Sequence, residues 1–325
     1  MATERMQRNL EIDTLRGFAC LLLVSFHVVG IAPGFGLHLP DNHWLQQVNS
    51  ALAYLRMPLF SFLSGYVYAF RPFKGDAASF IQGKMRRLLL PMLTVGTFFA
   101  LMQSVTPGAN DQIAHWWLLH IVPVAHFWFL EALFIVFLIV VALEHWRWLA
   151  SPQRFAGVWA LSVLAFVFLH TTAYFAVSGA VYLMPFFLAG LACKRFELRS
   201  VPVRWLAAAV FALACVWLIA LPQSLGQGLS LPGLLAGLSA AFLLLRSGWR
   251  WSALAYVGSY SFAIYLMHVF FTAGSRIGFT RLGVSNFYAL FVLGTLLGIA
   301  GPMLAALLIG RSARLKFWLL GEAPR

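Results

Sequence analysis

The sequence is poor in charged side chains and in cysteine. Only 10% of its 325 residues are Asp, Glu, Lys or Arg, whereas 61% are hydrophobic. An ordinary soluble domain carries about 25% charged residues, because its outer face must be hydrated. This shortage excludes a soluble globule. The three cysteines, Cys20, Cys193 and Cys215, all lie in or beside apolar segments, which argues against a disulfide framework or a paired-cysteine metal site, and we expect no metal.

Long apolar runs account for the excess of hydrophobic residues. A membrane-spanning helix uses about 20 apolar residues, so this composition provides material for roughly ten spans. We therefore predict an all-α fold, a polytopic membrane bundle of about ten transmembrane helices that forms a single domain over residues 1–325. The predicted spans are residues 12–31, 51–70, 88–105, 126–146, 154–171, 179–193, 204–221, 230–245, 253–274 and 286–310.

The positions of the 23 Lys and Arg residues predict the orientation of these spans. With the N-terminus in the cytoplasm, most of them fall in cytoplasmic loops, as the positive-inside rule requires. Arg16 and Arg56 lie within spans, and only Arg276 and Arg281 fall in an outside loop. Both termini are then cytoplasmic. The formal net charge of +13 is mainly a topology signal, so we expect membrane lipids rather than nucleic acid as partners.

The clearest ionisable side chains within predicted spans are Arg16, His27, Arg56, Glu131 and His268. Each costs on the order of 3 kcal/mol to insert, so each is a functional candidate. Arg16 and His27 are eleven residues apart, which places them on one helix face about 16 Å apart along the axis. This face presents a cation near the cytoplasm and a titratable base toward the outer leaflet.

A structural explanation is also open for two of these residues. Arg16 can extend to lipid phosphate or pair with Asp13, and His27 can be hydrogen-bonded to a neighbouring helix. The outside segments 32–50 and 106–125 contain histidine and tryptophan but no Lys or Arg. Their composition is typical of anchoring in the headgroup region.

Five segments, taken in order, are similar to the signatures of a known family. They are Ile12-Asp13-Thr14-Leu15-Arg16-Gly17 ending at His27, Arg56-Met57-Pro58-Leu59-Phe60 running into Phe62-Leu63-Ser64-Gly65-Tyr66, Lys84 and Arg87 before Leu88-Leu89-Leu90-Pro91, His126-Phe127-Trp128-Phe129-Leu130, and Gly258-Ser259-Tyr260-Ser261 with Tyr265 and His268. In this respect the chain resembles the membrane acyltransferase-3 family, from Ile12 to about residue 310. It departs from the pattern at Lys84, where the family usually has arginine. It resembles the stand-alone transmembrane form, without an added soluble domain.

The resemblance implies a membrane O-acyltransferase. Such an enzyme moves an acyl group, commonly acetyl, from cytoplasmic acyl-CoA to a hydroxyl of a cell-surface glycan or a lipid-linked glycan. For the acetyl-CoA donor, the resemblance and the positive charge point to Arg16, Lys84, Arg86 and Arg87, because the nucleotide end of CoA is polyanionic. Simple positive-inside topology is the alternative explanation for the loop residues.

His27 is our candidate for the general base, because histidine has the proton affinity that activation of an alcohol requires. Glu131 is expected at a similar depth and is a candidate to orient His27. The alternative is an ion pair between Glu131 and Arg56. Arg56 and His268 are candidates to stabilise the negative charge that develops on the thioester oxygen.

A function of a different class is also open. A transporter or flippase of an acyl donor or lipid-linked glycan could use the same buried charges as a pathway, and a structural membrane protein could hold them as polar contacts. No internal repeat is evident, which disfavours a transporter. We expect a multi-pass protein of the bacterial inner membrane.

Overall fold

The computed structural model describes residues 9–107, 109, 115–198, 201–221 and 230–323. Within these ranges the chain is helical, apart from turns, irregular segments and one isolated bridge. The elements are α1 (Leu10–Val29), α2 (Trp44–Ala51), α3 (Ala53–Tyr68), α4 (Ala77–Lys84), η1 (Met85–Leu89), α5 (Leu90–Val105), η2 (Trp116–Leu118), η3 (Ala125–Phe127), α6 (Trp128–His145), α7 (Pro152–Phe168), η4 (Tyr174–Ala176), α8 (Val177–Arg195), α9 (Val201–Ala220), α10 (Leu231–Arg246), α11 (Ser252–Ser259), α12 (Ser261–Arg281), α13 (Phe287–Ile309) and α14 (Ala313–Leu320).

The all-α prediction is confirmed, and each predicted span overlaps a helix. Among the described residues, seven helices are long and apolar enough to cross a membrane. Two further apolar helices, α7 and α10, have only 17 and 16 residues. The expected count of about ten spans is therefore not confirmed. The predicted span 253–274 corresponds to two helices, α11 and α12, because the backbone of Tyr260 leaves the helical region between them.

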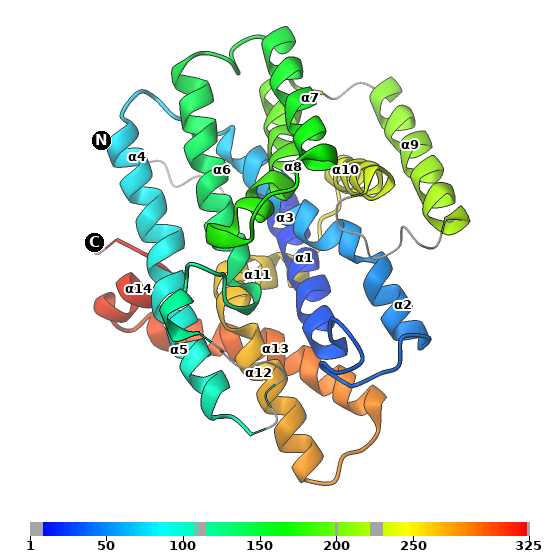
Figure 1. Ribbon diagram of the computed structural model, residues 1–325, viewed down its shortest axis with the longest axis vertical. Helices are drawn as coiled ribbons and strands as arrows, with labels where there is room; N and C mark the ends of the chain where they lie inside the picture. Colours follow the sequence, from blue (N-terminus) through cyan, green and yellow to red (C-terminus); the bar gives the residue numbers. More distant parts are fainter. Residues whose placement is uncertain (1–8, 108, 110–114, 199–200, 222–229, 324–325) are drawn as a thin grey trace.

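Helix α1 runs through the middle of the bundle and packs against α3, α11, α12 and α13 (Figure 1). Its first turn is capped by Asn9, whose side chain accepts hydrogen bonds from two backbone N–H groups. Contact with α11 depends on glycine: a Cβ atom at Gly17 would lie 1.9 Å from the backbone oxygen of Leu254. Small residues of this kind let helix backbones approach closely where lipid gives no hydrophobic drive to association.

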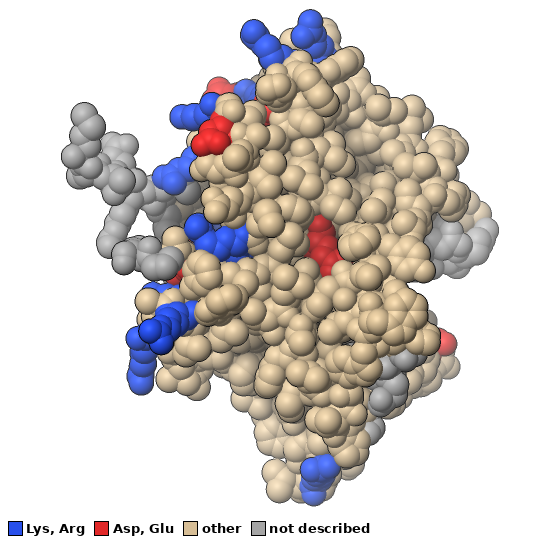
Figure 2. All heavy atoms as spheres, turned by 60° about the vertical axis from the view of Figure 1, so that its left-hand side comes forward, with Lys and Arg blue, Asp and Glu red and all other residues tan. Residues whose placement is uncertain are grey.

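Helix α9 lies at the edge of the bundle (Figure 1). Its side chains are apolar yet largely uncovered, including Trp205 at 71% and Ile219 at 75% exposure. A broad surface without Lys or Arg is also visible in Figure 2, while the basic side chains on that face lie mainly along its upper and left edges. Lipid is the solvent that suits such a surface.

Two local breaks position the residues discussed below. Helix α1 ends at Val29 and is followed by Gly30, whose φ of 102° is one that glycine adopts without steric cost. Between α4 and α5, the five residues of η1 form a π-helix that carries Arg86 and Arg87. A π-turn of this kind inserts one extra residue and changes the direction of neighbouring side chains, and it is frequent at functional sites.

Candidate active site

Three histidine rings pack together beside the last turn of α1. His27 comes from α1, His126 from η3 and His268 from α12. The ring centroids lie 4.8 Å apart for His27 and His268, 4.8 Å for His126 and His268, and 5.8 Å for His27 and His126. His126 is 5% exposed and His268 is fully buried, whereas His27 is half-buried. We call these residues the histidine cluster.

His268 has a defined tautomer in this arrangement. Its Nδ1 lies 2.8 Å from the backbone oxygen of Ile264 and 3.0 Å from that of Tyr265. A carbonyl oxygen only accepts a hydrogen bond, so Nδ1 carries the proton and donates it. Nε2 then has a free lone pair, and it is buried with no hydrogen-bond partner among the described residues. His268 therefore presents a proton acceptor to the interior of the bundle.

His126 belongs to the cluster although sequence reasoning did not select it as catalytic. Both of its ring nitrogens are buried and lack a hydrogen-bond partner among the described residues. Its backbone oxygen accepts a hydrogen bond from the Tyr265 hydroxyl. The preceding residue, Ala125, has a φ of 45°, a conformation that non-glycine residues adopt at a cost. The signal in the sequence is that His126 is the first residue of one of the family-like segments.

Glu131 lies one turn into α6 and is 5% exposed. Neither of its carboxylate oxygens has a hydrogen-bond partner among the described residues. The structure thus joins Glu131 by hydrogen bond or ion pair neither to His27 nor to Arg56. It interacts electrostatically with Tyr265, the residue that links α12 to His126.

Arg56 is buried beside the end of α1. Its guanidinium lies over the ring of Phe26, 3.9 Å from the centroid, and donates hydrogen bonds to the backbone oxygen of Leu52 and to Asn49. The Asn49 side chain in turn donates to the backbone oxygen of Gly30 at 3.0 Å. Arg56 and Asn49 therefore connect α2 and α3 to the last turn of α1, which carries His27. The charge of Arg56 also acts on His27 electrostatically.

The four predicted donor-binding cations gather at the other end of α1. Arg87 interacts electrostatically with Arg16 and Arg86, and Lys84 with Arg87. Lys84 also lies 3.7 Å from the ring centroid of Phe137. Four like charges in one place favour an anionic ligand, because such a ligand relieves their mutual repulsion.

Nearby groups satisfy part of this positive charge. Arg16 lies 3.5 Å from the Asp13 carboxylate, and this is the ion pair that the sequence offered as a structural role for Arg16. Arg87 donates to the backbone oxygen of Leu320 at 2.7 Å and lies 3.6 Å from the Glu322 carboxylate. We call Arg16, Lys84, Arg86 and Arg87 the basic site. Helix α14 therefore covers part of this site.

Proton transfer is the chemistry that the histidine cluster can perform. Imidazole exchanges protons readily near neutral pH, and three adjacent rings give a proton more than one acceptor. Among the residues that the structure describes, no group of three or more His, Cys, Asp or Glu side chains has the arrangement of a metal site.

A comparison with protein families identifies the class of enzyme. The family described as an acyltransferase domain matches residues 9–310, nearly the whole chain. The chain belongs to the acyltransferase-3 family. The match includes the histidine cluster and the four basic residues but not α14. This acyltransferase is a multi-pass membrane protein. No curated protein and no solved structure matches the chain.

Proposed function

We propose that this acyltransferase moves an acyl group, acetyl in the simplest case, from acyl-CoA to a hydroxyl of a cell-surface or lipid-linked glycan. The observation that carries the proposal is that one helix, α1, contributes His27 to the histidine cluster and Arg16 to the basic site. Arg16 and His27 are eleven residues apart on the continuous helix α1, which corresponds to about 16 Å. The donor's polyanionic end and the reacting hydroxyl are thereby kept apart.

In the proposed reaction, His27 removes the proton of the acceptor hydroxyl as its oxygen attacks the thioester carbonyl carbon. The new ester C–O bond forms, the C–S bond breaks, and the CoA thiolate leaves with the proton that His27 received. An alcohol is a poor nucleophile at neutral pH, so this proton transfer accounts for about 10²- to 10⁴-fold of the rate. His27 is the half-buried member of the cluster, which suits contact with a substrate.

The remaining candidates support this step. His268 accepts a proton or hydrogen bond at Nε2, which lies among the cluster rings. Arg56 is a candidate to stabilise the developing oxyanion, because it is a buried cation next to His27. Glu131 provides a carboxylate near Tyr265 that can compensate an imidazolium in the cluster.

At the basic end, Arg16, Lys84, Arg86 and Arg87 bind the phosphates of the donor in this proposal. Arginine contacts phosphate through two parallel N–H groups, whereas lysine acts as a single point charge. The distribution of Lys and Arg also supports an inner-membrane orientation with both termini in the cytoplasm, where acyl-CoA is available.

The test is label transfer by the purified protein in phospholipid vesicles. Acetyl-CoA with a radiolabelled acetyl group is added to one side, with and without acceptor glycans, and label in the glycan is measured. We expect wild-type protein to transfer label and His27→Gln to transfer none above background. Movement of intact acetyl-CoA or glycan across the vesicle, without a labelled ester, would instead indicate the transport alternative.

A further inference from the structure

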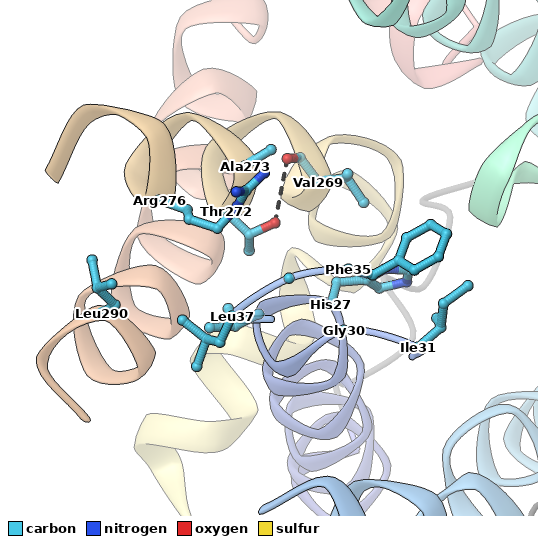
Figure 3. A pocket seen from close by; sticks show the side chains of 12 residues that line it. His27, Gly30, Ile31, Phe35, Leu37, Val269, Thr272, Ala273, Arg276 and Leu290 are labelled. Carbon is cyan, nitrogen blue, oxygen red and sulfur yellow. Dashed lines mark hydrogen bonds between the residues drawn. The ribbon is translucent and has the colours of Figure 1, made fainter. Parts of the chain in front are cut away.

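A cavity of about 80 Å³ lies at the end of α1, next to His27. Its walls are the last turn of α1 with the loop that follows it, one face of α12 and Leu290 of α13. Figure 3 shows His27 on the α1 side and Arg276 on the α12 side of this space. We call it the Arg276 pocket. It lies at the end of α1 that is remote from the basic site, and His27 of the histidine cluster is one of its lining residues.

Arg276 is a cation without an acidic partner. Its guanidinium donates to His38 Nε2 at 3.3 Å, and no carboxylate of the described residues lies within ion-pair distance of it. The hydroxyl of Thr272, also in the pocket wall, donates to the backbone oxygen of Val269 and balances no charge. Arg276 thus contributes an uncompensated positive charge to a pocket whose other ionisable lining group is His27.

The neighbouring arginine shows that Arg276 is not simply an interfacial anchor. Arg281 lies at the same end of α12, five residues further on, which turns it about 140° around the helix axis. Arg281 is exposed and does not line the pocket, whereas Arg276 is half-buried and does. An arginine that only reaches lipid phosphate has no need of a cavity shared with a histidine.

We propose that the Arg276 pocket is the acceptor subsite and that it selects acceptors with an anionic group. Arg276 binds a carboxylate or phosphate of the glycan through paired N–H groups, and this contact presents a nearby hydroxyl to His27. The inference rests on the proposed function, because it names the class of acceptor for the same reaction. A cavity of about 80 Å³ holds only the reacting part of an acidic glycan, so the rest of the glycan stays outside.

Substrate preference tests this assignment. Full-length protein in phosphatidylcholine vesicles receives labelled acetyl-CoA with methyl glucuronide, glucose 1-phosphate or methyl glucoside. We expect kcat/KM to be higher for one or both anionic sugars, and the two distinguish carboxylate from phosphate. In Arg276→Gln the ratio of kcat/KM for the anionic over the neutral sugar should fall at least tenfold. Arg281→Gln is the matched control and should keep the wild-type ratio.

A second measurement does not depend on catalysis. Without donor, each anionic sugar should raise the unfolding midpoint of wild type and Arg281→Gln more than that of Arg276→Gln, because a ligand of the native state stabilises it. If no acceptor is labelled but this Arg276-dependent shift is present, the proposed transfer reaction fails and the anion site stands. If label is transferred with no preference for anionic sugars, the transfer reaction stands and the inference is overturned.

Two further results would overturn the inference. The first is an equal effect of Arg276→Gln on charged and neutral sugars, which would indicate a structural role for the arginine. The second is an Arg276 effect that is present only when anionic phosphatidylglycerol is added, which would assign the side chain to lipid headgroups. Arg276→Lys keeps the charge without the paired N–H groups, so we expect a ratio between those of wild type and Arg276→Gln.

Discussion

His27 on α1 and His268 on α12 lie with ring centroids 4.8 Å apart. His268 Nδ1 donates to backbone oxygens of its own helix, so its lone pair at Nε2 is held in one direction. Hydrogen bonding by the backbone orients this ring in the way that a carboxylate orients the histidine of a hydrolase triad. His27 and His268 thus bring together side chains from α1 and α12, which are far apart in the sequence.

Replacement of either histidine should abolish turnover without unfolding the protein. We expect His27→Gln and His268→Gln each to lower kcat at least about 100-fold, with normal membrane insertion and elution in detergent. Because residues that act as one unit are not additive, the double variant should be no slower than the worse single variant. Independent, multiplying losses would show that the two rings do not act together.

His126→Phe tests whether the third ring takes part in proton transfer. The ring already packs against Phe99 and Phe127, and Tyr265 binds the backbone of His126 rather than its side chain. Phenylalanine should therefore preserve the packing and lower kcat, with little change in the acceptor KM. Turnover at the wild-type rate would assign His126 to packing alone.

Glu131→Gln should lower kcat and leave the unfolding midpoint equal or higher. The carboxylate is buried without a hydrogen-bond partner among the described residues, so its removal relieves a desolvated acid. The stability measurement separates this from the ion-pair alternative. A lower midpoint that the joint change Arg56→Met restores would indicate a Glu131–Arg56 pair after all.

Glu322→Gln should lower the KM for acyl-CoA about two- to fivefold. Glu322 lies 3.6 Å from Arg87, and both side chains are nearly half exposed, so their pair is worth about 1 kcal/mol at most. Loss of this pair frees Arg87 for the donor. Arg87→Gln should raise the same KM and reduce its dependence on salt. Glu11→Gln, which breaks the pair with Arg250 instead, is the control and should leave the donor KM unchanged.

We expect His120 to lower the free energy of unfolding when the pH falls from neutral to mildly acidic. It lies outside the candidate spans, and burial lowers the pKa of His120 below its usual 6.5. As the pH falls through about 6.5, the unfolded chain binds a proton that the folded protein does not, so the free energy of unfolding decreases. Above that pH the two states are equally neutral, and the effect is absent.

The check is the unfolding midpoint of wild type and His120→Gln between pH 7.5 and about 5. Glutamine can keep the hydrogen bond to Thr97, which lies 2.8 Å from His120 Nε2, but it does not titrate. We expect the midpoint of the variant to fall less over this interval. A slope in His120→Gln that is identical to that of wild type would contradict the prediction.

The sequence was sufficient for the helical membrane fold and for the relation between Arg16 and His27. The lipid around the protein sets its composition and the length of its apolar runs. The distance between two residues on one helix follows from the helix pitch alone. The count of about ten spans is not confirmed, because α7 and α10 are short and Tyr260 divides one apolar run into two helices. Local backbone conformation at a single residue is weakly encoded in hydropathy.

Hydropathy and residue spacing thus predict the solvent, the helices and the depth of each polar residue. The packing of the helices sets which residues are neighbours: His126 and His268 lie beside His27, Glu131 is bonded to neither of its expected partners, and Arg276 shares a cavity with His27. The physical reason is that depth follows from position along one helix, whereas lateral neighbours follow from how helix surfaces pack. Close contacts such as that of Gly17 with Leu254 set this packing.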